Sequence, residues 1–291
     1  MDKKYIADKA RLMHLEALSL SRGMKSGAFR SLYKGQGIEF NGVREYFAGD
    51  DVRSIDWNVT ARMGRPYVKT FEEERELDVF IILDVSASMK SGIGKRTKIQ
   101  TAVECASLLT LAACQNANPV GAVVFDGGIR FSSKPLSGFE HAQLLLSRYE
   151  KACSRTQTGS ALDNAILGAD RLLKKRSLVM IFSDFRTSAW LEPFGRLGQK
   201  NDVVAVCISD TVDERLPEAG AVPFTDPESG IRMILPTSSS KFKSAWNDAN
   251  YHRIETWKHE CMRRGGIPLQ ISTSSEPVVE LTRFFASREI Q

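Results

Sequence analysis

The sequence predicts a doubly wound α/β domain with a mostly parallel sheet, preceded by a small β-rich N-terminal segment. From about residue 77 onward, short apolar runs alternate with stretches that repeat apolar residues at helical intervals. The runs are rich in β-branched residues and nearly continuous, as strands buried on both faces are. Strands and helices in alternation imply parallel strands joined by right-handed crossovers. We therefore divide the chain into residues 1–76 and 77–291.

The composition is that of a globular protein without a dedicated nucleic-acid surface. Of the 291 residues, 42% are apolar and 26% are charged, and 21 Gly and 10 Pro are close to average usage. These values exclude collagen-like and wholly disordered classes. The net charge of +5 is spread along the chain, whereas nucleic-acid binders concentrate basic residues in one patch. We expect no nucleic-acid partner.

Three features favour a cytoplasmic protein that does not span a membrane. The N-terminus distributes charges through every turn and lacks the apolar core of a secretory signal. The longest apolar runs, such as 203–208, are far shorter than the roughly 20 residues that cross a bilayer. The five Cys form no CxxC pair and several lie in apolar runs, which is typical of free thiols in a reducing compartment.

The first 76 residues predict one helix followed by hairpins and irregular turns. Apolar residues recur at helical intervals over 9–22, which predicts an amphipathic helix. Between residues 26 and 70 the helical period is lost, glycines accumulate and aromatic residues are scattered. Because the segment 35–76 has too few apolar residues for a core of its own, we expect it to pack against the main domain and to bury Trp57.

In the main domain, five apolar runs predict strands and three periodic stretches predict helices. The predicted strands are 77–85, 120–125, 177–184, 202–210 and 268–273, and the predicted helices are 99–113, 162–173 and 240–264. Residues 221–235 have two β-like arms around Asp-Pro-Glu-Ser-Gly, which predicts a hairpin inserted between a strand and the next helix. The sequence assigns this hairpin no role.

Polar residues follow two of the predicted strands at the edge of the sheet where ligands of open α/β folds bind. Asp84, Ser86 and Ser88 alternate at the end of the first run, so one carboxylate and two hydroxyls can converge. Asp184 ends the run at 177–184, and a hydroxyl from the loop 155–160 could reach the same edge. Oxygen donors with few carboxylates suit Mg²⁺ or Mn²⁺ better than Zn²⁺, which prefers His and Cys.

These motifs resemble the metal-ion-dependent adhesion site (MIDAS) of von Willebrand factor A domains. They are DVSAS at 84–88, the Thr-rich RTQTGS at 155–160 and FSD at 182–184. The resemblance implies that the metal ligands are Asp84, Ser86, Ser88, Thr156 and Asp184. Thr158 competes with Thr156 for the loop position. That family commonly continues Asp-Gly after its last Asp, whereas Phe185 follows here.

The segment upstream resembles a bacterial family, domain of unknown function 58, whose members join such a segment to a von Willebrand A domain. The matching motifs are GQGIEF, VREYFAGDDVRSIDWNVTAR and the stretch from VKTF through DVSASM. Members of that family are typically encoded beside MoxR-type AAA+ ATPases. The resemblance therefore implies a MoxR-type protein partner and a part in chaperone-like assembly or regulation of other proteins.

We expect a metal-dependent protein-interaction module without catalytic residues. Two Asp and neutral hydroxyls leave Mg²⁺ able to attract one more carboxylate, which a partner could provide. The alternative is a metal-dependent phosphohydrolase on a Rossmann-like fold, but such enzymes need a second carboxylate where this chain has Ser86. A third possibility is a scaffold with a purely structural metal. The chain has no GxxxxGK[ST] run, so ATP hydrolysis would fall to the partner.

Overall fold

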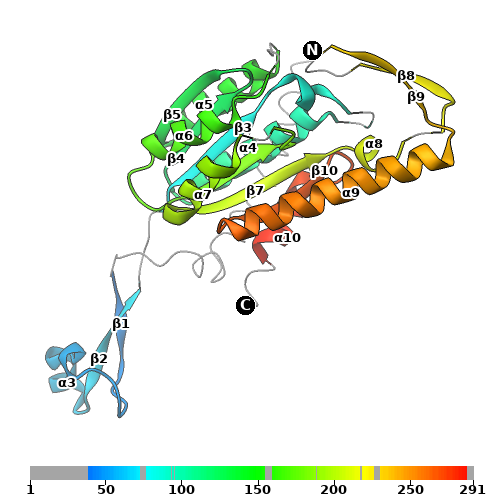
Figure 1. Cartoon of the computed structure of the whole chain (residues 1–291). Helices are drawn as coiled ribbons and strands as arrows, with labels where there is room; N and C mark the ends of the chain where they lie inside the picture. Colours follow the sequence, from blue (N-terminus) through cyan, green and yellow to red (C-terminus); the bar gives the residue numbers. More distant parts are fainter. Residues whose placement is uncertain are drawn as a thin grey trace. The chain divides into compact units, whose positions relative to one another are not determined.

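The chain divides into two compact units, one of which is residues 34–76 and the other of which contains residues 77–291. The computed structural model describes residues 39–72, 77–92, 94, 96–154, 159–187, 189–216, 218–225 and 230–286 (Figure 1). The helix predicted over 9–22 lies outside the described residues.

The small unit is a two-stranded antiparallel sheet with short helices between its strands. In chain order its elements are β1 (Glu39–Glu45), η1 (Val52–Ser54), α3 (Trp57–Met63) and β2 (Tyr67–Glu72). Asp56 caps α3 by accepting hydrogen bonds from two backbone N–H groups, and Gly64 ends it in the left-handed conformation. The unit therefore contains an antiparallel pair, as expected, together with a helix that we did not predict.

Several large apolar side chains of the small unit are exposed. Trp57, predicted to be buried, is 68% exposed, and Phe47, Val52 and Met63 are exposed as well. The predicted burial of Trp57 is therefore not found within this unit, so only residues outside the unit could bury its side chain. That residues 35–76 pack against the main domain stays a prediction.

The main unit is built on a six-stranded sheet in the order β10-β7-β6-β3-β4-β5. Its strands are β3 (Val79–Asp84), β4 (Val120–Phe125), β5 (Ile129–Leu136), β6 (Leu178–Ser183), β7 (Asp202–Ser209) and β10 (Ile267–Ser272). All neighbours are parallel except β5, which runs antiparallel to β4 at one edge. Every residue of β3, β4 and β6 is buried, which explains their unbroken apolar sequences.

Helices cover both faces of this sheet, so the doubly wound fold class is confirmed (Figure 1). On one face lie α4 (Lys98–Gln115), α5 (Phe139–Ser154) and α10 (Pro277–Ala286). On the other face lie α6 (Leu162–Leu172), α7 (Leu191–Lys200) and α9 (Ser240–Arg263). Alternate residues of β3 divide between the two cores: Ile81 packs with α4, and Ile82 packs with α6.

The hairpin predicted near 221–235 is present between β7 and α9. Its strands are β8 (Ala221–Thr225) and β9 (Arg232–Pro236), and the short helix α8 (Thr211–Glu214) precedes it. In Figure 1 the hairpin extends beyond the end of the sheet. Within the described residues, no helix is both long enough and apolar enough to traverse a bilayer.

The strand order places the expected ligand edge between β3 and β6. The chain leaves β3 for β4 on one side and later returns to β6 on the other side of β3. Such a reversal is the point where open α/β sheets bind ligands, at the carboxyl ends of the strands. Asp84 ends β3 and Asp184 directly follows β6, so both predicted carboxylates lie at this point.

Candidate functional site

Asp84 is fixed by hydrogen bonds to both of its carboxylate oxygens. Oδ1 accepts from the backbone N–H of Ser86 at 2.9 Å, and Oδ2 accepts from the hydroxyl of Ser183 at 2.6 Å. Ser183 can reach it because β6 pairs with β3 in parallel, so the last residues of the two strands lie side by side. The side chain of Asp84 is 1% exposed. Burial and pairing therefore hold this carboxylate in one orientation.

The hydroxyls of Ser86 and Ser88 lie next to each other in the loop after β3. Their Oγ atoms are 3.2 Å apart, and both residues are buried. The 3-10 helix η2 (Ala87–Lys90) follows Ser86 directly and contains Ser88. Its tight turn brings the two side chains together. Two neutral oxygen donors thus stand within four residues of Asp84 along the chain.

Asp184 contributes a buried carboxylate oxygen that lacks a hydrogen-bond donor. Its side chain is almost fully buried, and Oδ1 accepts from the backbone N–H of Arg186 at 3.3 Å. Among the residues that the structure describes, Oδ2 has no hydrogen-bond partner. Two cations lie near this oxygen, Arg186 Nε at 3.6 Å and Lys98 Nζ at 3.7 Å, but neither donates a hydrogen bond to it. A buried carboxylate oxygen without a donor is costly unless a nearby positive charge compensates for the lost water.

The backbone after Asp184 adopts a conformation that ordinarily favours glycine. Phe185 has a φ of 51°, in the left-handed region. Its ring is buried against Trp190 and Trp257, with ring centroids 5.0 and 5.5 Å away. The chain therefore makes the turn that the Asp-Gly of the resembling family would make readily. Aromatic packing compensates for the unfavourable backbone angle.

The loop ligand among the five predicted metal ligands lies outside the described residues, whether it is Thr156 or the alternative Thr158. Ser160, next to that gap, has a buried hydroxyl without a hydrogen-bond partner among the described residues. We did not single out Ser160 as a ligand, although it belongs to the RTQTGS motif. Its hydroxyl is a further oxygen donor on the predicted loop.

The two carboxylates influence each other electrostatically. Burial, and next the negative charge of Asp184, raise the pKa of Asp84 to about 7, although hydrogen bonds from Ser183 and Ser86 oppose the rise. A nearby negative charge disfavours the ionised form of a buried carboxylate. A cation between Asp84 and Asp184 would remove that conflict, and this is the chemistry that the arrangement favours.

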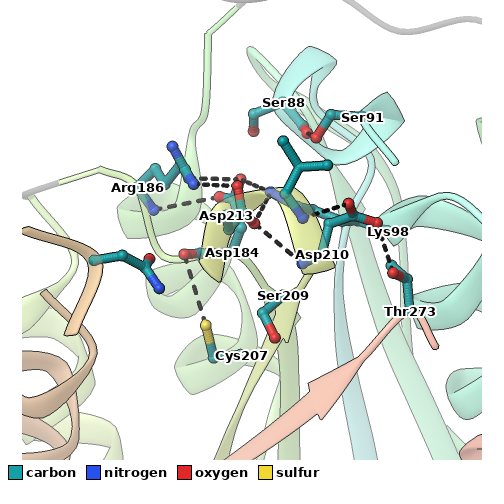
Figure 2. Close-up of polar contacts among 12 residues, drawn as sticks. Ser88, Ser91, Lys98, Asp184, Arg186, Cys207, Ser209, Asp210, Asp213 and Thr273 are labelled. Carbon is teal, nitrogen blue, oxygen red and sulfur yellow. Dashed lines mark hydrogen bonds and ion pairs between the residues drawn. The ribbon is translucent and has the colours of Figure 1, made fainter. Parts of the chain in front are cut away.

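A buried lysine, which we did not single out, also reaches this edge of the sheet (Figure 2). Lys98 is 2% exposed, and its Nζ lies 2.8 Å from Asp213 Oδ2 and 3.7 Å from Asp184 Oδ2. Asp213 Oδ1 also pairs with Arg186 at 2.6 Å. Burial alone would raise the pKa of Asp213, but the charges of Lys98 and Arg186 outweigh it, so the pKa is lowered.

One feature of the sequence could have indicated this lysine. Lys98 is the first residue of α4, where the helix dipole disfavours a cation. A lysine in the first turn of an otherwise apolar helix therefore indicates a nearby anion. The identity of that anion, Asp213 on α8, depends on how two elements meet in space and has no local signal.

The donor chemistry of these residues fits a hard divalent cation. Asp84 and Asp184 provide carboxylate oxygens, Ser86 and Ser88 provide hydroxyls, and one oxygen of Asp184 is without a donor. In the described part of the chain, no group of three or more His, Cys, Asp or Glu side chains is arranged to hold a metal. The fit thus rests on two carboxylates and hydroxyls, as in an open site with room for further ligands.

Comparisons with known proteins find relatives over the whole chain and solved structures over its larger part. The uncharacterized protein Rv1480 of Mycobacterium tuberculosis is 29% identical over 295 residues, covering 99% of this chain and 91% of that protein. The hypothetical protein BatB of Bacteroides thetaiotaomicron covers 74% of this chain and 100% of its own, with a TM-score of 0.47 and 15% identity. A von Willebrand factor type A structure from Catenulispora acidiphila covers 77% of this chain and 45% of its own, with a TM-score of 0.40 and 13% identity.

A family model gives the broadest assignment. The model described as protein of unknown function DUF58 matches residues 42–255. The match starts within β1 of the small unit and ends within α9 of the main unit, so it includes the whole edge described above. The chain therefore belongs to the DUF58 family, the one that its motifs between residues 40 and 90 resemble.

Proposed function

We propose that this protein is a metal-dependent protein-interaction module that binds a partner carboxylate through Mg²⁺ or Mn²⁺ at the edge between β3 and β6. The observation that carries the proposal is the buried Asp184 Oδ2, which lacks a donor among the described residues and lies near a second buried carboxylate, Asp84. The residues that would hold the ion are Asp84, Ser86, Ser88 and Asp184, with Thr156 as the loop ligand that the resemblance implies. When bound, the ion supplies a positive charge that accepts one further oxygen ligand.

Binding suits the chemistry of this site better than turnover does. A phosphohydrolase of this fold type needs a second acid two residues after Asp84, and that position is the neutral Ser86. The nearby cations, Lys98 and Arg186, make their close ion pairs with Asp213 and lie farther from Asp184 Oδ2, at 3.7 and 3.6 Å. The proposal therefore assigns no catalytic residue, and phosphohydrolase activity is the outcome that would replace it.

The partner that we propose is a MoxR-type AAA+ ATPase in the cytoplasm. Membership of the DUF58 family supports this choice, because members are typically encoded beside such ATPases. In this arrangement the ATPase supplies the energy of ATP hydrolysis and the present chain supplies a switchable contact. A carboxylate of the ATPase on the ion would give that contact a charge-assisted anchor that depends on the metal.

Two substitutions of one serine test the carboxylate bridge. Ser86→Ala removes an oxygen donor and should weaken the ion, whereas Ser86→Asp adds an anion that retains the ion but occupies the charge that the partner needs. The same changes at Ser132, an exposed serine of β5, are the matched control. Association with the purified ATPase is measured at saturating Mg²⁺ and again with EDTA.

The outcomes separate three functions. Loss of association for Ser86→Asp, with metal binding retained, supports the bridge. If Ser86→Asp associates as well as the wild type does, the ion is structural and the bridge is wrong. Hydrolysis of a phosphomonoester that depends on both Mg²⁺ and Asp84 would instead support the phosphohydrolase.

A further inference from the structure

Lys98 stands between two carboxylates that have different roles. Its Nζ makes a close ion pair with Asp213 Oδ2 at 2.8 Å and lies farther from Asp184 Oδ2, at 3.7 Å (Figure 2). Asp184 is a proposed metal ligand, and the oxygen that faces the ammonium is the one without a hydrogen-bond partner among the described residues. The ammonium is therefore close to that oxygen without donating a hydrogen bond to it, and Arg186 Nε lies at a similar distance, 3.6 Å, also without a hydrogen bond.

The position of Asp213 is fixed independently of Lys98. Its Oδ2 accepts a hydrogen bond from the backbone N–H of Asp210 at 3.1 Å, and its Oδ1 pairs with Arg186 at 2.6 Å. Asp210 in turn caps α8 and accepts a hydrogen bond from the hydroxyl of Thr273 at 2.6 Å. The carboxylate of Asp213 is thus held in place by residues that follow β6, β7 and β10. It can therefore act as a fixed anchor for the ammonium of Lys98.

We propose that Asp213 is a positioning residue for the metal site, because it holds the ammonium of Lys98 away from Asp184 and keeps Asp184 Oδ2 open to a divalent ion. The inference rests on the proposed function, since it concerns the same site. Without the charge of Asp213, Asp184 is the carboxylate within reach of Lys98 in the described structure. The ammonium would then pair with Asp184 and compete directly with the ion for its oxygen.

The inference predicts opposite effects for two neutralising substitutions. Asp213→Asn should weaken Mg²⁺ binding about tenfold. This is the size expected if the Lys98 ammonium moves from 3.7 Å into contact with Asp184 at an intermediate dielectric. Lys98→Met should strengthen Mg²⁺ binding, because it removes the competing cation. Asp213→Glu keeps the charge and should stay within about threefold of the wild type. Affinity is measured by calorimetric titration of the full chain with MgCl₂, which requires no partner.

A matched control lies at the opposite end of β7. Asp202 pairs with Arg176 at 2.6 Å, far from the proposed ligands along the strand. Asp202→Asn removes a comparable Asp–Arg pair and should leave the affinity for Mg²⁺ unchanged. A loss of affinity in Asp213→Asn but not in Asp202→Asn therefore reflects the position of the charge rather than the loss of any ion pair.

The double variant decides whether Lys98 transmits the effect. If it does, Asp213→Asn should cost no Mg²⁺ affinity in the Lys98→Met background, whereas an equal loss in both backgrounds overturns the inference. If Lys98→Met does not fold, the comparison of Asp213→Asn with Asp213→Glu decides, and equal affinities overturn it. A wild-type chain that binds no Mg²⁺ overturns the proposed function as well, so the two failures are distinguishable.

Discussion

Asp78 and Asp84 flank the same buried strand, and they differ in what neutralises them. Asp78, just before β3, pairs with Lys175 at 3.0 Å, and this lysine is 46% exposed. Asp84, at the other end, forms no ion pair within the described residues, and burial together with a second carboxylate raises its pKa. One end of β3 carries an ion pair between a buried carboxylate and a half-exposed lysine, whereas the other keeps two carboxylates together. Such a conflict is typical of functional sites.

The lysines that pair with carboxylates near the two ends of β3, Lys175 and Lys98, differ in their exposure to water. Lys175 keeps nearly half of its side chain in water, whereas Lys98 is 2% exposed and is enclosed with Asp213 and Asp184. An ion pair contributes less when one partner is largely hydrated, as Lys175 is, because water screens its charge. A buried cation depends on its partners, because no water replaces them. The carboxyl end of the sheet is therefore the end where single charges should matter.

The largest expected difference between the two ends concerns metal binding. Asp84→Asn removes a charged ligand and should weaken Mg²⁺ binding by more than about a hundredfold. Asp78→Asn, at the other end of β3, should leave the affinity unchanged. Calorimetric titration of both variants checks this prediction. Equal affinities for Asp84→Asn and the wild type would place any bound ion elsewhere on the chain.

The next difference concerns stability in the absence of metal. Lys98→Met removes a buried cation from Asp213 and Asp184, which then share Arg186, and should lower the free energy of unfolding by about 3 kcal/mol. Lys175→Met removes the half-exposed partner of Asp78 and should lower it by less, about 1 kcal/mol. Urea denaturation in EDTA measures both values. Equal losses would show that burial of the ion pair makes no difference at the carboxyl end.

The pH dependence of stability should distinguish Asp84 from an ordinary paired carboxylate. Its pKa in the folded protein is about 7, above the ordinary 3.8, so the folded state holds a proton that the unfolded state releases. Its contribution to stability is therefore greatest in acid and is lost as the pH rises through that window. Between pH 5 and pH 7 the metal-free wild type should lose about 2 kcal/mol relative to Asp84→Asn. A difference that is flat or rises with pH would contradict the assigned direction.

The sheet could be predicted from the sequence where burial is complete. All five runs predicted as strands are strands in the structure, and the run at 120–125 coincides with β4. The antiparallel edge strand β5 was missed, because it is largely exposed and its residues, IRFSSKPL, form no continuous apolar run. An edge strand with one solvated side gives a weaker pattern than a central strand.

The candidate site was predictable where its residues share one motif or stand at the end of a predicted strand. Asp84, Ser86 and Ser88 belong to one motif, and Asp184 directly follows β6, whose neighbour in the sheet is β3. The contact between Lys98 and Asp213 joins the start of α4 to α8, more than a hundred residues apart. Such a pair depends on how separate elements meet, and no local pattern specifies it.

The smallest expected effect compares two backbone strains, again at opposite ends of the sheet. Ala117, in the turn between α4 and β4, has a φ of 58°, and Phe185, after β6, has a φ of 51°. Ala117→Gly should raise the free energy of unfolding by about 1 kcal/mol, because glycine adopts this angle without strain. Phe185→Ala and Phe185→Gly both lose the aromatic packing. The free energy of unfolding of Phe185→Gly should nevertheless be higher than that of Phe185→Ala by about 1 kcal/mol, because glycine adopts the left-handed angle without strain.

Thermal or urea denaturation of the four proteins gives both differences. If Phe185→Gly is no more stable than Phe185→Ala, the loop after Asp184 relaxes once the ring is gone, and only the packing on Trp190 and Trp257 holds its shape. If Phe185→Gly is more stable than Phe185→Ala by as much as Ala117→Gly is more stable than the wild type, the loop keeps its left-handed turn without the ring. In that case the hydrogen bonds from Arg253 to the Asp184 carbonyl and from Phe185 N–H to Ser183 suffice to position the carboxylate.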